Sequence, residues 1–120
     1  MNSSTQTRKI LKKYYDGLSS KGDWHSMLSD EILLTGTIAK ESKGKEPFVN
    51  NNFFKIIRSL KVKQMIVENE SACALIGYDL VSPKGKSFSS DVAEIWKVKD
   101  KKLDFLAIFF DTAEFQKSMT

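Results

Sequence analysis

Residues Asp91–Asp111 read Asp-Val-Ala-Glu-Ile-Trp-Lys-Val-Lys-Asp-Lys-Lys-Leu-Asp-Phe-Leu-Ala-Ile-Phe-Phe-Asp, and this stretch decides the fold. Its first part alternates between two sets of side chains, as a strand does when its two faces meet different surroundings. The polar segment Lys99–Lys102 in the middle is a turn signal. The stretch therefore predicts two antiparallel strands, at Lys86–Lys99 and Lys102–Asp111.

Both faces of this strand pair carry apolar side chains. In the first strand, one face carries Val92, Glu94, Trp96 and Val98, and the other carries Asp91, Ala93 and Ile95. In the second strand, Leu103, Phe105, Ala107 and Phe109 alternate with Leu106, Ile108 and Phe110. Helices can cover only one face of such a sheet, so the other face needs a second cover. A symmetric partner is the usual solution, and we expect a homodimer that associates through the sheet.

Further strand patterns precede this pair. Val62–Glu68 and Ala72–Ser82 are β-compatible runs, and the strong turn sequence Ser82-Pro83-Lys84-Gly85 follows them. Ile32–Ile38 adds a short strand before a polar surface loop. Helical patterns lie mainly in the first half and strands in the second. The fold class is therefore α+β, with N-terminal helices packed on a curved, mostly antiparallel sheet.

Three helices are expected in the first half of the chain. Thr7–Ser20 is amphipathic, and Asp23 can cap a short helix through Leu28. From Pro47 to Leu60 the helical periodicity is the clearest in the chain. The triplet Asn50–Asn52 lies in this segment, and we expect it mostly to ring the exposed side of the first turn. The alternative is a cluster of amides that face a ligand.

Composition limits the class of protein. The chain has 120 residues, which fits a single domain spanning residues 1–120. Its single cysteine, Cys73, and single histidine, His25, cannot assemble a structural zinc site, so no metal and no cofactor are expected. The N-terminus lacks an apolar signal core, and no apolar run approaches the roughly 18 residues of a membrane span. We expect a cytoplasmic protein without membrane contact.

The formal net charge of +4 raises the question of a nucleic-acid partner. The basic residues gather on the helix expected at Thr7–Ser20 and around the turn at Lys99–Lys102. Both sets fit solvated surfaces better than a track for phosphates. We therefore expect no nucleic-acid partner.

Five segments in this order resemble the SnoaL-like branch of the NTF2-like superfamily over nearly the whole chain. They are Tyr14–Trp24, Ser29–Glu31, Gly44–Pro47, Ala93–Asp100 and Ile108–Asp111. The resemblance implies a cone-shaped α+β fold in which a bent sheet wraps a long helix and encloses an apolar cavity. Members of the superfamily are often dimers, which agrees with the two apolar faces.

The resemblance also implies candidate catalytic residues. Aligned with the isomerase branch, the hydrogen-bonding tyrosine falls on Tyr14 and the hydrogen-bonding acid on Glu94. The general base falls on Gly36, so it is missing, and ketosteroid-type isomerisation is doubtful. In the cyclase branch, an aspartate that corresponds to Asp111 takes the acid/base role.

Each of these three residues also has a structural interpretation. Asp111 can cap or turn the chain after the last strand. Glu94 can pair with a lysine or lie at the dimer surface, and Tyr14 can be a core aromatic. His25 beside Trp24 fits a half-exposed helix surface.

Four large aromatic side chains either line a cavity or fill it. They are Trp24, Phe53, Trp96 and Phe109. We expect a pocket protein that binds a small apolar ligand, such as a ring or polyketide-like compound. One alternative is a cofactor-independent acid/base enzyme that uses Asp111 and Glu94, and the other is a non-catalytic dimeric interaction module.

Overall fold

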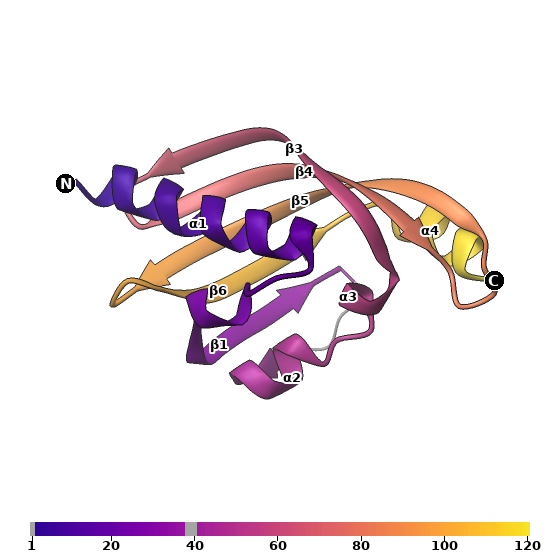
Figure 1. Cartoon of the computed structure of the whole chain (residues 1–120), viewed down its shortest axis with the longest axis horizontal. Helices are drawn as coiled ribbons and strands as arrows, with labels where there is room; N and C mark the ends of the chain where they lie inside the picture. The colour runs from indigo at the N-terminus through magenta and orange to yellow at the C-terminus, as the bar shows by residue number, and fades with distance from the viewer. Residues whose placement is uncertain (1, 38–40) are drawn as a thin grey trace.

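The computed structural model describes residues 2–37 and 41–120. Figure 1 shows that most helices precede the run of long strands along the chain. In chain order they are α1 (Ser3–Ser20), the single 3-10 turn η1 (His25–Met27), β1 (Leu28–Gly36), β2 (Ser42–Lys43), α2 (Lys45–Val49), α3 (Phe53–Ile56), β3 (Ile57–Glu68), β4 (Ser71–Val81), β5 (Ser87–Lys99), β6 (Lys102–Phe109) and α4 (Thr112–Met119).

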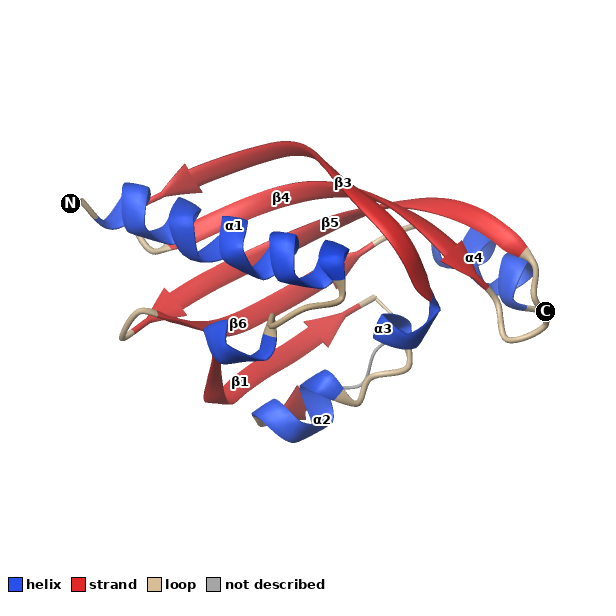
Figure 2. Cartoon of the chain, viewed as in Figure 1, coloured by secondary structure: helices blue, strands red, loops and turns tan. Residues whose placement is uncertain are grey.

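One six-stranded sheet organises the molecule. Its strand order is β2-β1-β6-β5-β4-β3, so β3 to β6 form an antiparallel meander. β1 joins the free edge of β6 in parallel, and the short β2 pairs antiparallel with β1. Figure 2 shows the long strands curving around α1, with α2 and α3 beside β1 and α4 at the far end. This is the expected α+β cone with a mostly antiparallel sheet.

The core lies between α1 and the concave face of the sheet. β4 alternates strictly, because its even-numbered residues from Ala72 to Leu80 are buried and most odd-numbered ones are exposed. β5 follows the same rule from Val92 to Val98, which confirms the expected division of its two faces. α1 buries the stripe that its periodicity predicts: Leu11, Tyr14, Tyr15 and Leu18.

The first helix is confirmed, and it begins one turn earlier than predicted. The side chain of Asn2 caps it by accepting a hydrogen bond from the backbone N–H of Thr5 at 2.8 Å. Lys21 ends the helix in a left-handed conformation, at φ 58°. The Thr7 hydroxyl donates to the carbonyl of Asn69 at 2.6 Å and so ties α1 to the β3–β4 turn.

The short helix expected from Asp23 through Leu28 is only the single 3-10 turn η1, in which Asp23 accepts from the N–H of Ser26 at 3.1 Å. The strand expected at Ile32–Ile38 begins earlier, at Leu28, and ends at Gly36. The predicted end at Ile38 falls outside the described residues.

The long helix predicted from Pro47 to Leu60 is wrong. The chain forms two short helices on either side of Asn50–Asn52 and then enters β3 at Ile57. Asparagine is a poor helix former, and the β-branched pair Ile56 and Ile57 suits an extended chain. Pairing with β4 also stabilises a strand here, because each further residue of β3 adds to the hydrogen-bonded pairing between the two strands. Tertiary structure therefore overrides the local period.

The expected division of faces in the last strand is also wrong at one point. The pairing between β5 and β6 shifts next to Val98, which opposes Leu103, while Trp96 opposes Leu106. Leu103 and Leu106 are therefore both buried on the concave face, although their parity differs. The irregularity moves Leu103 to the concave face, whereas Phe105, Ala107 and Phe109 stay together on the convex side, where Phe109 is 44% exposed.

Gly17 lies where α1 packs against Asp23 and Trp24, in the segment that leads to β1. A Cβ atom at this position would lie 2.3 Å from the carbonyl oxygen of Asp23, well inside van der Waals contact. We expect Gly17→Ala to destabilise the protein by about 1 to 3 kcal/mol, because the helix must move away from that carbonyl. In an exposed helix the same change would stabilise by about 1 kcal/mol.

Urea denaturation measures this effect, with Ser19→Ala on the exposed side of α1 as the control. An unchanged or raised free energy of unfolding for Gly17→Ala would contradict the close approach of the two segments.

Candidate functional site

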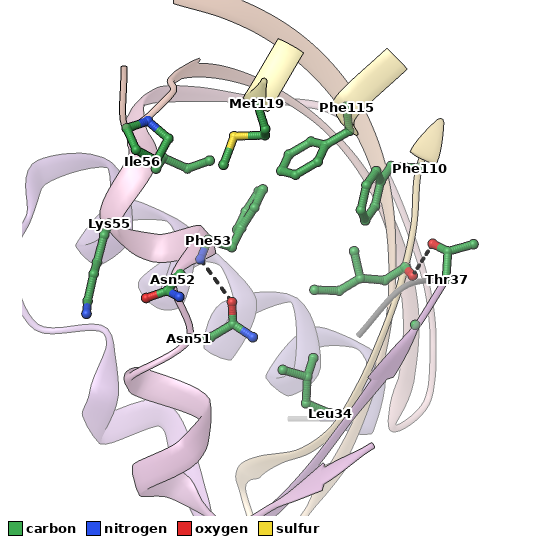
Figure 3. Close-up of a pocket in the computed structure, with 13 residues that line it drawn as sticks. Leu34, Thr37, Asn51, Asn52, Phe53, Lys55, Ile56, Phe110, Phe115 and Met119 are labelled. Atoms are coloured by element: carbon green, nitrogen blue, oxygen red, sulfur yellow. Dashed lines mark hydrogen bonds between the residues drawn. The ribbon is translucent and has the colours of Figure 1, made fainter. Parts of the chain in front are cut away.

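A cavity of about 420 Å³ lies between the ends of β1 and β6 and the helices α3 and α4. Side chains from several distant parts of the sequence line it, as Figure 3 shows. They are Leu34, Gly36, Thr37, Asn51, Asn52, Phe53, Lys55, Ile56, Pro83, Ile108, Phe110, Phe115 and Met119.

Most of the cavity wall is apolar. Leu34 on β1 and Ile108 on β6 form its floor, because these two strands place them on the concave face. Phe53 of α3 faces Phe115 of α4, with ring centroids 6.3 Å apart. Phe110 packs against Phe115 at 4.9 Å and completes an aromatic wall. Such a lining favours an apolar ligand.

The polar groups of the cavity belong mainly to the link between α2 and α3. The Asn51 side-chain oxygen accepts a hydrogen bond from the backbone N–H of Phe53 at 2.9 Å. Asn52 and Lys55 stand beside it and are exposed at the mouth. The Thr37 hydroxyl lies across the cavity and donates to the carbonyl of Ile108 at 3.2 Å.

The sequence left two alternatives for Asn50–Asn52, an exposed position on the helix or a cluster of amides that faces a ligand, and the three residues differ in this respect. Asn51 and Asn52 line the cavity, whereas Asn50 is exposed outside it.

Gly36 lies in the cavity wall with no room for a side chain. A Cβ atom there would be 2.5 Å from the carbonyl oxygen of Ile108, its parallel partner in β6. The general base that the resemblance to the isomerase branch places at Gly36 therefore does not fit this backbone for a steric reason. A carboxylate could enter here only if β1 and β6 moved apart.

Glu94 forms a second polar centre, inside the core rather than in the cavity. It is 2% exposed, and its two carboxyl oxygens accept hydrogen bonds from the hydroxyls of Tyr15 at 2.5 Å and Tyr78 at 2.7 Å. The indole N–H of Trp96 donates to the Tyr15 hydroxyl at 2.9 Å. The network joins α1 to β4 and β5, and it excludes the expected alternatives of a lysine partner or a surface position for Glu94.

Burial changes the acidity of this cluster. Desolvation raises the pKa of Glu94 to about 7, although the hydrogen bonds from Tyr15 and Tyr78 oppose the rise. The pKa values of both tyrosines are raised well above the usual range, first by burial and then by the nearby carboxylate. Glu94 therefore changes protonation near neutral pH, which suits an acid/base group.

The position of Glu94 limits what it can do. It does not line the cavity. Its neighbour in β6 is Ile108, whose side chain does line the cavity. Its partner Tyr78 packs edge-on against Phe53, with ring centroids 5.0 Å apart. Ile108, Tyr78 and Phe53 thus form a layer next to the carboxyl group.

The three predicted catalytic residues do not meet at one point. Tyr14 is buried among Tyr15, Trp24 and Trp96, and its ring meets each of them edge-on. The adjacent Tyr15, and not Tyr14, donates a hydrogen bond to Glu94.

Asp111 is exposed and caps α4 by accepting from the N–H of Glu114 at 3.1 Å. This is the capping role that the sequence offered as its alternative.

Of the four aromatic residues expected at the pocket, Phe53 lines it. Trp24 and Trp96 lie in the core, and Phe109 is on the opposite face of the sheet. Sequence reasoning missed Tyr15 and Tyr78. For Tyr78 the strand parity held a signal, because its buried face is also the face of Glu94.

His25 is exposed and lies against the edge of the Trp24 ring, 4.1 Å between centroids. Within residues 2–37 and 41–120, no three His, Cys, Asp or Glu side chains group closely enough to hold a metal ion. None of the described helices combines the length and apolar character that a membrane crossing requires.

No family model matches the chain, and no curated protein matches its sequence. Solved structures are nevertheless similar to it over nearly its whole length. A candidate SnoaL-like polyketide cyclase from Jannaschia sp. CCS1 is 13% identical, with a TM-score of 0.85 over 99% of this chain and 94% of that one. A candidate ketosteroid isomerase from Kribbella flavida is 16% identical, with a TM-score of 0.78 over 92% and 82%.

TerC, co-crystallised with polyporic acid, is 12% identical, with a TM-score of 0.81 over 95% of this chain and 98% of that one. Other similar structures are NTF2-like proteins, among them one of unknown function from Burkholderia pseudomallei. At these identities the likeness concerns the fold. The chain has the NTF2-like fold, shared with SnoaL-like and ketosteroid isomerase-like proteins, and the resemblance seen in the sequence is confirmed at that level.

The raised pKa of Glu94 predicts how stability depends on pH. Between its ordinary pKa of 4.5 and about 7, the folded protein keeps a proton that the unfolded chain has released. Stability is therefore highest at low pH in this window and falls as pH rises through 7, by at most roughly 3 kcal/mol. Glu94→Gln carries no titratable group, so we expect a flatter curve between pH 5 and 8.

Urea denaturation across this pH range measures the difference between the two proteins. Glu68→Gln, at an exposed carboxylate on β3, is the matched control and should follow the wild type. A Glu94→Gln curve parallel to the wild type would show that Glu94 is already ionised in the fold.

Proposed function

We propose that this protein binds a small apolar ligand, of the size of a fused ring system or short polyketide, in the cavity between β1, β6, α3 and α4. The observation that carries the proposal is the cavity itself, with about 420 Å³ of space behind a mainly apolar wall. Ligand pockets of globular proteins lie in the same size range, about 300 to 1,000 Å³. The large aromatic residues of the core do not fill this space, because Trp24 and Trp96 lie elsewhere.

The comparisons support a small organic ligand. TerC, which has this fold, was co-crystallised with polyporic acid, and two other similar structures are candidate cyclases or isomerases. Fold similarity alone does not transfer a reaction. The proposal therefore rests on the cavity and takes the relatives as support.

The alternative, an acid/base enzyme that uses Asp111 and Glu94, finds less support in the geometry. Asp111 is engaged as the cap of α4, and Glu94 lies behind the layer that includes Tyr78 and Ile108. A general acid or base must come within hydrogen-bond reach of the reacting atom, directly or through one water. The pKa of Glu94 near 7 is the one feature that favours this alternative.

We also propose that the protein is a homodimer that associates through the convex face of the sheet. Two adjacent cross-strand rows are apolar there, one through Ile66, Cys73 and Ile95, and one through Leu75, Ala93 and Phe109. Ile66 is 60% exposed, and Ile95 is 38% exposed. Toward the α4 end the face becomes polar, with the Lys63–Asp91 ion pair at 2.8 Å. A bounded apolar patch of this kind marks an interaction surface.

Binding of a neutral apolar probe tests the ligand proposal. N-phenyl-1-naphthylamine should gain fluorescence on entering the cavity. Met119→Trp adds a large side chain to the cavity wall, and we expect it to weaken binding by about tenfold or more, or about 1.4 kcal/mol.

Lys117→Trp is the matched control, because it adds the same side chain to the exposed side of α4. If the wild-type protein gives no signal, or if both variants bind equally well, the cavity does not hold the probe and the proposal fails.

Sedimentation equilibrium tests the dimer. The wild-type protein should have twice the mass of one chain at micromolar concentration. Ile95→Lys places a charge in the middle of the apolar rows and should give a monomer with unchanged circular dichroism, because burying an unpaired charge is costly. Lys61→Ala, an exposed change on β3, should leave the dimer intact. A monomeric wild type would refute the interface.

A further inference from the structure

The cavity is chemically two-sided, and this asymmetry bears on its ligand. Asn51 and Asn52 lie on one side, in the link from α2 into α3, and the exposed Lys55 follows in α3. Figure 3 shows Phe110, Phe115 and Met119 gathered on another side, toward α4. A ligand that fills this space therefore meets the amides of Asn51 and Asn52 at one end and a mainly apolar wall at the other. This step rests on the proposed ligand-binding function.

The side-chain amide of Asn51 has a fixed orientation. Its oxygen accepts a hydrogen bond from the backbone N–H of Phe53 at 2.9 Å, so the nitrogen must point the other way. The amide nitrogen is then left on the side of Leu34 and Thr37, within the ring of lining residues (Figure 3). Asn51 thus offers N–H donors to a ligand and keeps its acceptor for the backbone.

The charged residues near Asn51 also favour a ligand that carries a hydrogen-bond acceptor. Lys55 contributes a cation at the mouth, and none of the described lining residues is a carboxylate. The acidic residues Asp111 and Glu114 lie at a separate, smaller hollow on another side of Phe115. Donors and a positive charge favour an oxygen acceptor on the ligand, and an anionic oxygen most of all.

We propose that the ligand is an apolar acid. Its ring or chain packs between Phe53, Ile108 and Phe115, and its anionic oxygen, a carboxylate or an ionised enol or phenol, accepts a hydrogen bond from the Asn51 amide. Lys55 adds a screened attraction at the mouth, and it acts on the approach of the ligand more than on its final position. The Asn51 amide is the element that selects acids over neutral compounds of the same shape.

Two competitors of similar shape test this selection. 2-Naphthoate and 2-methylnaphthalene differ in the carboxylate, and each can be titrated against bound N-phenyl-1-naphthylamine. We expect naphthoate to displace the probe at about a tenfold lower concentration, as a charge-assisted hydrogen bond should allow. Asn51→Asp keeps the oxygen that holds the Phe53 N–H and replaces the donor with a negative charge. It should abolish or reverse the preference for naphthoate over methylnaphthalene, with each displacement referred to the affinity of that variant for the neutral probe.

Asn50→Asp is the matched control, because it makes the same change one residue earlier, outside the cavity lining. It should keep the preference for naphthoate. Equal displacement by both competitors in the wild type would overturn this inference and leave the proposed function standing. The inference also falls if Asn51→Asp weakens both competitors alike, or if Asn50→Asp has the same effect as Asn51→Asp. Failure of the neutral probe to bind the wild type would remove the proposed function and this inference together.

Discussion

The helix that covers the concave face is much shorter than the strands it covers, and the cavity follows from this mismatch. The 18 residues of α1 span about 27 Å, whereas the 13 residues of β5 span about 43 Å. One helix therefore seals only part of the face. The remaining part receives the short helix α3 and the terminal helix α4, which approach from different directions and meet mainly through Phe53 and Phe115. Rigid elements that meet in this way do not fill the space between them, and the unfilled part is the cavity.

The hydrogen bonds of Glu94 fix the position of α1 on the concave face of the sheet. Among the buried side chains of the described residues, Glu94 is the one with an ionisable carboxyl group, and Tyr15 and Tyr78 satisfy both of its oxygens. A buried carboxyl group without these partners would cost several kcal/mol, so α1 is stable at one position along the sheet and costly to shift. The same network that fixes α1 holds the Glu94 carboxyl group against Tyr78, so Glu94 lies next to the cavity without lining it.

The features that the sequence predicted well depend on local pattern. The features that it failed to predict depend on how distant segments pack and pair. Alternation in β4 and β5 and the stripe on α1 follow from nearest neighbours in the chain, so these elements and the α+β class were predictable, whereas the cone shape came from the resemblance to a known superfamily. The helix expected from Pro47 failed because Ile57 and Leu60 satisfy a helical period and also suit a strand, and only the presence of β4 decides between the two. Phe53 was found at the cavity, but Phe110, Phe115 and Met119 were not, since their meeting depends on the direction that α4 takes after the last strand. Tyr14 and Tyr15 both lie on the buried stripe of α1, so periodicity alone does not tell which of the two hydroxyls reaches Glu94.

Gly36 has a consequence for how this fold could gain or lose catalysis over evolutionary time. The general base that the isomerase alignment requires cannot be restored by a single codon change at Gly36, because the carbonyl of Ile108 occupies the space of the first side-chain atom. A lineage with this backbone would first have to widen the β1–β6 pairing, at a cost in stability and with no gain in activity. Leu34, two residues earlier on the same strand, already carries a side chain that lines the cavity. An acid introduced there would meet the ligand from the floor, so a base is more accessible at Leu34 than at Gly36.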